Sequence, residues 1–232
     1  MLKDLVLAID TASVRGSLAL LQGERLLAEY TLESPASYLN RLLPGIDRLF
    51  LDIQRQPTEI KAVIVSSGPG NYTGLRIGMS TAKGLALGLD CPVVAIPTLE
   101  TLAANFPFTP FPICPVLDAK KNEVYAAFYR CKQGFPEILG DYLLVTPAAL
   151  ADRITGPTIL TGPGLERYGP WWQSRLGRHA VLAPPELRHL RASALGRLGL
   201  FRLEHEQPCF LDQLAPFYLR PAEAELHRRP IN

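Results

Sequence analysis

Three closely spaced glycines mark the part of this sequence with the clearest potential for chemistry. The segment SSGPGNYTGLRIG, residues 66–78, follows the apolar run Ala62–Val65 and contains Gly68, Gly70 and Gly74. Such a run predicts a buried strand, and the residues after the glycines have the spacing of a helix. A strand that turns into a helix presents free backbone N–H groups, which can bind an anion. The segment is therefore a candidate site for a phosphate, a substrate or a partner.

Neither common nucleotide-binding motif fits the segment. A P-loop has four residues between its glycines and a lysine after the second, whereas three residues separate Gly70 from Gly74 and Leu75 follows. In a Rossmann fingerprint the third glycine would come one place earlier. We therefore expect no cofactor. The alternative is a vestigial site that binds a nucleotide or another anion weakly. Its candidate residues are Asp10, Thr11, Gly68, Gly70, Thr73 and Asp118.

The helix after the segment is unusually rich in glycine. Gly74, Gly78 and Ala82 share one face at a spacing of four residues, and Gly84 and Gly88 extend a neighbouring ridge. Each glycine inside a helix costs about 1 kcal/mol relative to alanine. Small residues allow another backbone to approach closely. That backbone belongs either to the same chain or to a partner subunit, and the pattern alone does not distinguish the two.

Two aspartates could support a different kind of chemistry. Asp10 and Asp118 each follow an apolar run, where a carboxylate can hold Mg²⁺ near a phosphate or cap a turn. The first possibility predicts an ATP-dependent phosphotransferase. The four histidines lie in the last quarter of the chain at irregular spacing, so we expect no metal site. They are His179, His189, His205 and His227.

The elements that must position these residues form two lobes. In residues 1–106 the patterns predict strands at 5–9, 17–21, 26–32, 62–65 and 92–96, an amphipathic helix at 39–53 and a helix near 73–89 capped by Thr73. Residues 107–215 begin with a proline-rich stretch and predict strands near 113–118, 123–130, 138–145 and 157–161. Helices are expected at 146–154 and 193–204. The tail, 216–232, is expected to be extended and could return to the first lobe.

An internal repeat links the two lobes. Residues 9–19 and 117–127 both read as strand, aspartate, polar turn and strand, at an offset of 108 residues from Asp10 to Asp118. This predicts a duplicated α/β unit.

Composition limits the class of protein. Hydrophobic residues make up 47% of the chain, the net charge is +2, and the four cysteines form no C-x-x-C pair. We expect a cytoplasmic protein with reduced thiols and no membrane span. Arginines become frequent after residue 175, which suggests a solvated surface more strongly than an RNA-binding one.

Several segments together resemble one known family. They are LAIDT at 7–11, RLLP at 41–44, SGPGNYTGLRIG at 67–78, AKGLA at 82–86, DAKKNEVY at 118–125 and YLR at 218–220. These segments resemble the bacterial TsaB (YeaZ) family, whose paralogue is TsaD. One position departs from the pattern, because Tyr38 stands where many TsaB sequences have a histidine.

The resemblance implies a two-lobed α/β fold of the actin/Hsp70/sugar-kinase type. It also implies a non-catalytic subunit, without catalytic residues of its own, of the complex that adds a threonylcarbamoyl group to the tRNA adenosine next to the anticodon. The implied partners are a catalytic TsaD-like subunit and a TsaE-like ATPase, with tRNA as the substrate of the complex and homodimers when TsaD is absent. The expected interface lies on the first-lobe helices, at Leu39, Leu42, Leu43, Ile46, Gly74, Leu75, Gly78, Met79 and Ala82.

Overall fold

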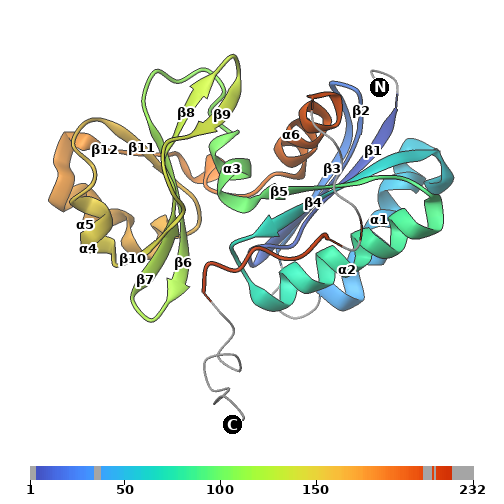
Figure 1. Ribbon diagram of the computed structural model, residues 1–232, viewed down its shortest axis with the longest axis horizontal. Helices are drawn as coiled ribbons and strands as arrows, with labels where there is room; N and C mark the ends of the chain where they lie inside the picture. The colour runs from blue at the N-terminus through green and yellow to red at the C-terminus, as the bar shows by residue number, and fades with distance from the viewer. Residues whose placement is uncertain (1–3, 34–37, 206–210, 212, 221–232) are drawn as a thin grey trace, which may run out of the picture.

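The computed structural model describes residues 4–33, 38–205, 211 and 213–220 of the chain. It has two lobes, each built around a β-sheet (Figure 1). Among the described residues, no helix has both the length and the apolar character needed to cross a bilayer.

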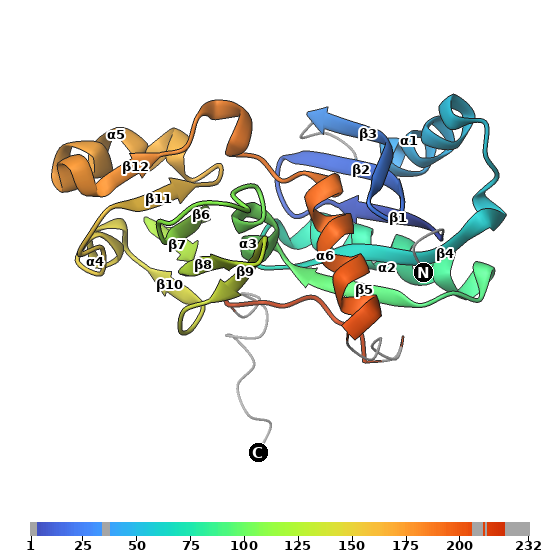
Figure 2. The same cartoon turned by 90° about the horizontal axis from the view of Figure 1, so that it is seen from above.

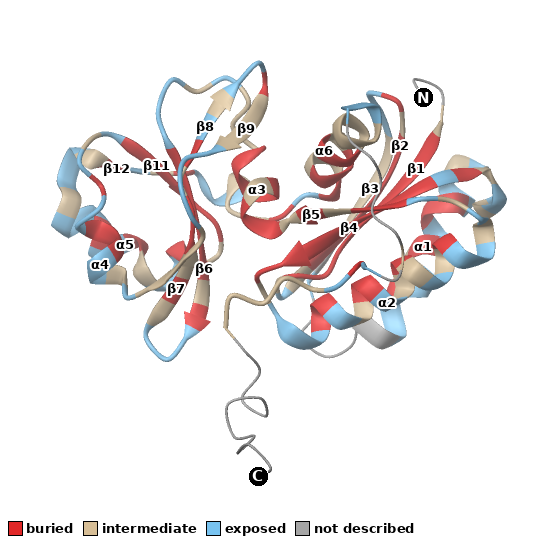
Figure 3. Cartoon of the chain, in the orientation of Figure 1, coloured by how far each residue is buried: buried red, intermediate tan, exposed pale blue. Residues whose placement is uncertain are grey.

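The first lobe contains a sheet with the strand order β3-β2-β1-β4-β5. Its strands are β1 (Leu5–Asp10), β2 (Arg15–Gln22), β3 (Arg25–Glu33), β4 (Ile60–Gly68) and β5 (Val93–Pro97). The first three form the predicted antiparallel meander, and β4 and β5 continue the sheet in parallel. Every residue of β1 is buried, as its uninterrupted apolar sequence predicts for a central strand covered on both faces (Figure 3).

Helices α1 (Tyr38–Ile53) and α2 (Tyr72–Leu89) cover one face of this sheet. Helix α1 continues through Pro44, which lies beyond its first turn. The N-cap of α2 is Asn71, whose side chain accepts a hydrogen bond from the backbone N–H of Gly74 at 2.8 Å. The prediction that Thr73 caps this helix is wrong, because the helix begins one residue before it.

The second lobe repeats the strand arrangement of the first. Its main sheet has the order β10-β7-β6-β11-β12, with β8 and β9 attached beside β6. The pairs β6/β7 and β7/β10 are antiparallel, and β6/β11 and β11/β12 are parallel, so they match β1/β2, β2/β3, β1/β4 and β4/β5 in turn. The predicted duplication is therefore present at the level of topology.

Two predicted strands of the second lobe are interrupted in the structure, and a helix at 165–176 and a strand at 180–182 were not predicted. The strands are β6 (Ile113–Lys120), β7 (Glu123–Ala126), β8 (Tyr129–Lys132), β9 (Phe135–Ile138), β10 (Leu143–Val145), β11 (Thr158–Thr161) and β12 (Ala180–Leu182). The helices are α4 (Pro147–Ala151) and α5 (Leu165–Leu176), and α3 (Thr98–Ala103) lies between the two lobes. The predicted strands 123–130 and 138–145 are each interrupted, because β7 and β8 take different partners and a turn separates β9 from β10.

Helix α6 (Ala192–His205) returns to the first lobe and covers the second face of its sheet (Figure 2). Its buried residues Leu195 and Leu198 pack with Val6, Ala8 and Ile64 of the sheet. The second lobe predicted at 107–215 therefore extends too far along the chain, since α6 belongs to the first core. Periodicity identified this helix but could not assign it to a sheet.

The turn after β1 packs directly against the start of α2. The backbone N–H of Asn71 donates to the carbonyl of Ala12 at 2.7 Å, and the hydroxyl of Thr11 donates to the carbonyl of Gly74 at 2.7 Å. A Cβ on Gly74 would overlap the carbonyl oxygen of Thr11, and one on Gly78 would overlap the hydroxyl of Thr11. The glycines of this ridge are therefore required for contact within the chain.

Replacement of Gly74 by alanine should destabilise the protein. The new methyl group would meet a backbone oxygen that cannot rotate away, and such overpacking costs about 1–3 kcal/mol. We expect the free energy of unfolding in urea to fall by about that amount. The control is Gly84→Ala, where a Cβ meets no described heavy atom within 4 Å and a gain of about 1 kcal/mol is expected. Equal effects of the two substitutions would contradict this packing argument.

Candidate functional site

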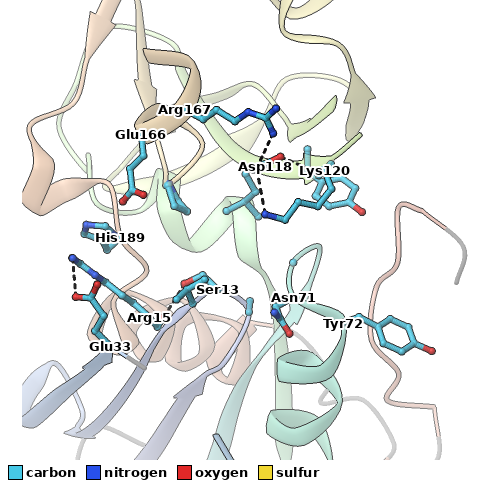
Figure 4. A pocket seen from close by; sticks show the side chains of 17 residues that line it. Ser13, Arg15, Glu33, Asn71, Tyr72, Asp118, Lys120, Glu166, Arg167 and His189 are labelled. Carbon is cyan, nitrogen blue, oxygen red and sulfur yellow. Dashed lines mark hydrogen bonds and ion pairs between the residues drawn. The ribbon is translucent and has the colours of Figure 1, made fainter. Parts of the chain in front are cut away.

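A cleft of about 530 Å³ lies between the lobes (Figure 4). The turn after β1 and the start of α2 form its first-lobe wall, and the β6–β7 hairpin and the start of α5 form its second-lobe wall. Its polar and charged lining includes Ser13, Arg15, Glu33, Asn71, Asp118, Lys120, Glu166, Arg167 and His189. The duplicated topology thus brings equivalent edges of the two sheets to face one another.

Most charged side chains in the cleft are paired with one another. Arg15 and Glu33 form an ion pair at 2.9 Å on the first-lobe side. On the second-lobe side, Asp118 lies 3.5 Å from Lys120 and 3.4 Å from Arg167 (Figure 4). Since Asp118 already has two cationic neighbours, a Mg²⁺ ion would have to displace them to bind this carboxylate.

His189 is the imidazole of the cleft. Partial burial, followed by the nearby charge of Arg15, lowers its pKa, although Glu166 opposes this shift. The ring is therefore neutral at neutral pH. In that form one ring nitrogen can donate a hydrogen bond and the other can accept one.

Asp10 lies outside the cleft, beneath the turn after β1. It is wholly buried, and its Oδ1 accepts hydrogen bonds from the hydroxyl of Ser66 and, at 3.3 Å, from the backbone N–H of Ala12. Its Oδ2 is buried without a hydrogen-bond partner among the described residues. Burial raises the pKa of Asp10 to about 6, against the lowering effect of the two hydrogen bonds. The carboxyl group is thus positioned to stabilise the turn.

The structure brings few of the predicted anion-site residues together. Gly70 and Asp118 line the cleft. Asp10 and Thr11 are buried, and Gly68 lies beneath the carbonyl of Phe217 from the C-terminal segment. Thr73 is exposed in the first turn of α2 but does not line the cleft. Sequence reasoning missed Arg15, Arg167 and His189, which come from segments that no local pattern connects.

The predicted interface residues also divide into two groups. Most are buried within the chain, which matches the intramolecular alternative for the glycine ridge: Leu42, Ile46, Gly74, Leu75, Gly78, Met79 and Ala82. Leu43 is 53% exposed, and the side chain of Leu39 lies outside the described residues. The exposed face of α1 and α2 instead carries Leu51 and Leu87, at 70% and 76% exposure. These two leucines fall outside the buried apolar faces of their helices, which is the sequence signal that could have identified this surface.

The late arginines mainly serve the fold. Arg197 donates to the carbonyls of Gly134 and Ala104, and Arg202 donates to the carbonyl of Ala95 and pairs with Glu100. Among the residues the structure describes, no group of three or more His, Cys, Asp or Glu side chains could hold a metal ion.

Replacement of Asp10 by asparagine should remove one component of the pH dependence of stability. The carboxylate of Asp10 binds a proton more tightly in the folded chain than in the unfolded chain, because folding raises its pKa from 3.8 to about 6. The wild-type free energy of unfolding therefore loses about 3 kcal/mol from this group as pH rises from about 4 to about 6, and nothing more above that. Urea unfolding across pH 4–8 should show this slope in the difference between wild type and Asp10→Asn. Parallel profiles would contradict the assignment.

Comparison with known proteins identifies the family of the chain. The family model for TsaD, described as tRNA N6-adenosine threonylcarbamoyltransferase, matches residues 32–158. The protein TsaB of Bacillus subtilis is 32% identical over 228 residues, which cover 95% of this chain and 96% of that protein. TsaB of Escherichia coli is 35% identical over 217 residues, covering 89% and 94%. Both bear the name tRNA threonylcarbamoyladenosine biosynthesis protein.

Solved structures agree with this relationship. YeaZ from Pseudomonas aeruginosa superposes with a TM-score of 0.79 at 27% identity, covering 93% of this chain and all of that one. Component A of the (R)-2-hydroxyglutaryl-CoA dehydratase of Acidaminococcus fermentans has a TM-score of 0.50 at 10% identity, covering 85% and 97%, and shares the actin-like fold alone. The sequence relatives, the YeaZ structure and the two-lobed fold together show that this chain belongs to the TsaB (YeaZ) family.

Proposed function

We propose that this protein is a non-catalytic scaffold and activator in the synthesis of threonylcarbamoyladenosine in tRNA. In this proposal it pairs with a TsaD-like catalytic subunit, and a TsaE-like ATPase joins the complex in the cytoplasm. Its membership of the TsaB family supports the pathway, since its relatives are named as biosynthesis proteins for this modified nucleoside. The match of residues 32–158 to the TsaD family model supports a common ancestor for this chain and TsaD.

The exposed face of α1 and α2 carries the pairing part of the proposal. Leu43 and Leu51 lie two helical turns apart on α1, and Leu87 is exposed on the neighbouring α2. Burial of an exposed leucine side chain against a partner is favourable, because it removes apolar surface from water. Three highly exposed leucines on two adjacent helices therefore favour a docking surface.

The second ridge of α2 fits a closely packed partner. Ser80, Gly84 and Gly88 are exposed at a spacing of four residues, so they share one side of the helix. A Cβ at Gly84 or Gly88 would meet no described heavy atom within 4 Å. These glycines, unlike Gly74 and Gly78, therefore have no contact within the described chain that requires them. We propose that they allow the backbone of the partner to approach α2, and that this face also forms homodimers when the catalytic subunit is absent.

The buried position of Asp10 disfavours the alternative of a phosphotransferase. A Mg²⁺-nucleotide in the cleft could not reach this carboxylate unless the turn holding Thr11 and Ala12 moved away. Asp118 does line the cleft, but Lys120 and Arg167 pair with it. Weak binding of an anion near Gly70 and Asp118 remains compatible with the proposed role as a subunit.

Replacement of Gly84 by leucine should block pairing while the fold is retained. The side chain would project from the proposed interface into the space that the partner backbone occupies. We expect at least a tenfold loss of affinity for the TsaD-like subunit in titration calorimetry, which corresponds to about 1.4 kcal/mol. The matched control is Gly156→Leu in the second lobe, where a Cβ also meets no described heavy atom within 4 Å. Thermal melting verifies folding of both variants, and undiminished binding by Gly84→Leu would contradict this interface.

Gly78 is unsuitable for the same experiment, although its position in the ridge first suggests it. A side chain at position 78 would overlap the hydroxyl of Thr11 inside the chain. A leucine there would therefore disturb the fold together with any interface.

Reconstitution tests the role in the pathway. Purified TsaD-like and TsaE-like subunits, tRNA, ATP and threonylcarbamoyl-adenylate should give modified tRNA only slowly without this protein and at least tenfold faster with it. The protein alone should give no modified tRNA, and calorimetry with Mg²⁺-ATP should show no binding below millimolar concentration. Full modification without this protein would overturn the proposal, and submicromolar ATP binding by the isolated chain would favour the phosphotransferase.

A further inference from the structure

The described C-terminal segment, residues 214–220, runs from the first lobe to the second along one side of the molecule (Figures 1 and 2). We call it the strap. It begins at Leu214, which is buried in the first-lobe core together with residues of the sheet and of α1 and α2. It ends at Arg220, on the β6–β7 hairpin of the second lobe.

Phe217 and Tyr218 attach the strap to the first lobe. The backbone N–H of Phe217 donates to the carbonyl of Ser67 at 2.7 Å. The ring of Tyr218 stacks on Tyr72, with centroids 4.9 Å apart, and its hydroxyl accepts a hydrogen bond from Nε of Arg76 at 3.1 Å. The strap is therefore fixed to the loop after β4 and to the first turns of α2.

Arg220 and Phe217 attach the strap to the second lobe. Nη1 of Arg220 donates to the carbonyl of Ala119 at 2.6 Å, and Nη2 pairs with the carboxylate of Glu123. The ring of Phe217 meets Tyr142 edge-on, with centroids 5.0 Å apart. Since Arg220 is only 18% exposed, its ion pair is screened less than one at the open surface.

The lobes also meet at α3, apart from the strap. Leu99 and Leu102 of α3 pack in one cluster with Leu75 of the first lobe and with Ile113 and Leu117 of the second. Phe201 of α6 also packs on Phe135 of β9, with ring centroids 4.2 Å apart. Packed contacts of this kind can act as a pivot, because packed helices and sheets slide and rotate by small amounts. A second attachment away from the pivot removes this freedom.

The strap lies beside the cleft. Tyr72, which stacks on the strap, and Ala119, whose carbonyl binds Arg220, both line the cleft. Any rotation that separates these two walls must break the contacts of Tyr218 or those of Arg220. We propose that the strap is a conformational latch that sets the angle between the lobes and thereby the width of the cleft.

The test measures the distance between the lobes in the full-length protein. Spin labels carried by non-natural amino acids at Glu24 and Ser174, both exposed and in different lobes, leave the native cysteines in place. Electron–electron double resonance should give one narrow distance distribution in the wild type. Arg220→Ala and Tyr218→Ala should each broaden it at least twofold or add a second peak.

The control is Arg175→Ala, which removes an exposed ion pair with Asp152 at 2.9 Å far from the strap and should leave the distribution narrow. Thermal melting identifies any variant that unfolds. For such a variant the milder Arg220→Lys and Tyr218→Phe replace the alanine changes, since they weaken the same contacts and keep the bulk of the side chain. Folded strap variants with the wild-type distribution would overturn the latch, as would equal broadening by the control.

Discussion

The close approach of the turn after β1 to the start of α2 determines how the first lobe is assembled. The carbonyls of Thr11 and Ala12 occupy the space that side chains at positions 70 and 74 would fill, and the hydroxyl of Thr11 occupies that of position 78. The resulting hydrogen bonds hold α2 against the sheet at its N-terminal end. This arrangement buries Asp10, forms one wall of the cleft and leaves the opposite side of α2 facing outward.

The two aspartates of the repeat show how a duplicated unit can diverge. Asp10 and Asp118 stand at equivalent points, where a strand pairs with the next through an antiparallel hairpin. Gly70, Gly74 and Gly78 allow the start of α2 to pack on the turn that follows Asp10. Asp118 instead stays at the cleft beside Lys120 and Arg167. Removal of a carboxylate from water raises its pKa, and nearby positive charges stabilise its ionised form. The same residue in the same local motif therefore stabilises a turn in one lobe and organises surface charges in the other.

The sequence predicted most of what depends on local pattern and little of what depends on assembly. The meander, α1, α2 and the repeat at 9–19 and 117–127 follow from apolar periodicity and turn residues, and the structure has them. Periodicity also identified the face that holds Gly74 and Gly78, but it could not name the neighbour, because a helix face looks the same whether it meets its own chain or a partner. Helix α6 and the cleft residue His189 come from distant parts of the chain, so their positions required the tertiary structure.

Gly68 extends the constraint on the glycine segment to the end of the chain. Its φ of +121° lies in the region that glycine favours, and a side chain there would overlap the carbonyl of Phe217 in the strap. The segment that first suggested a phosphate site thus contacts the turn after β1 on one side and the strap on the other. Gly68, Gly70 and Gly74 make these contacts to backbone oxygens, which explains why glycine is needed there without any ligand. On the outer ridge of α2, by contrast, Gly84 and Gly88 have no such structural requirement within the described chain, which is why we propose that ridge, with the exposed face of α1, for docking.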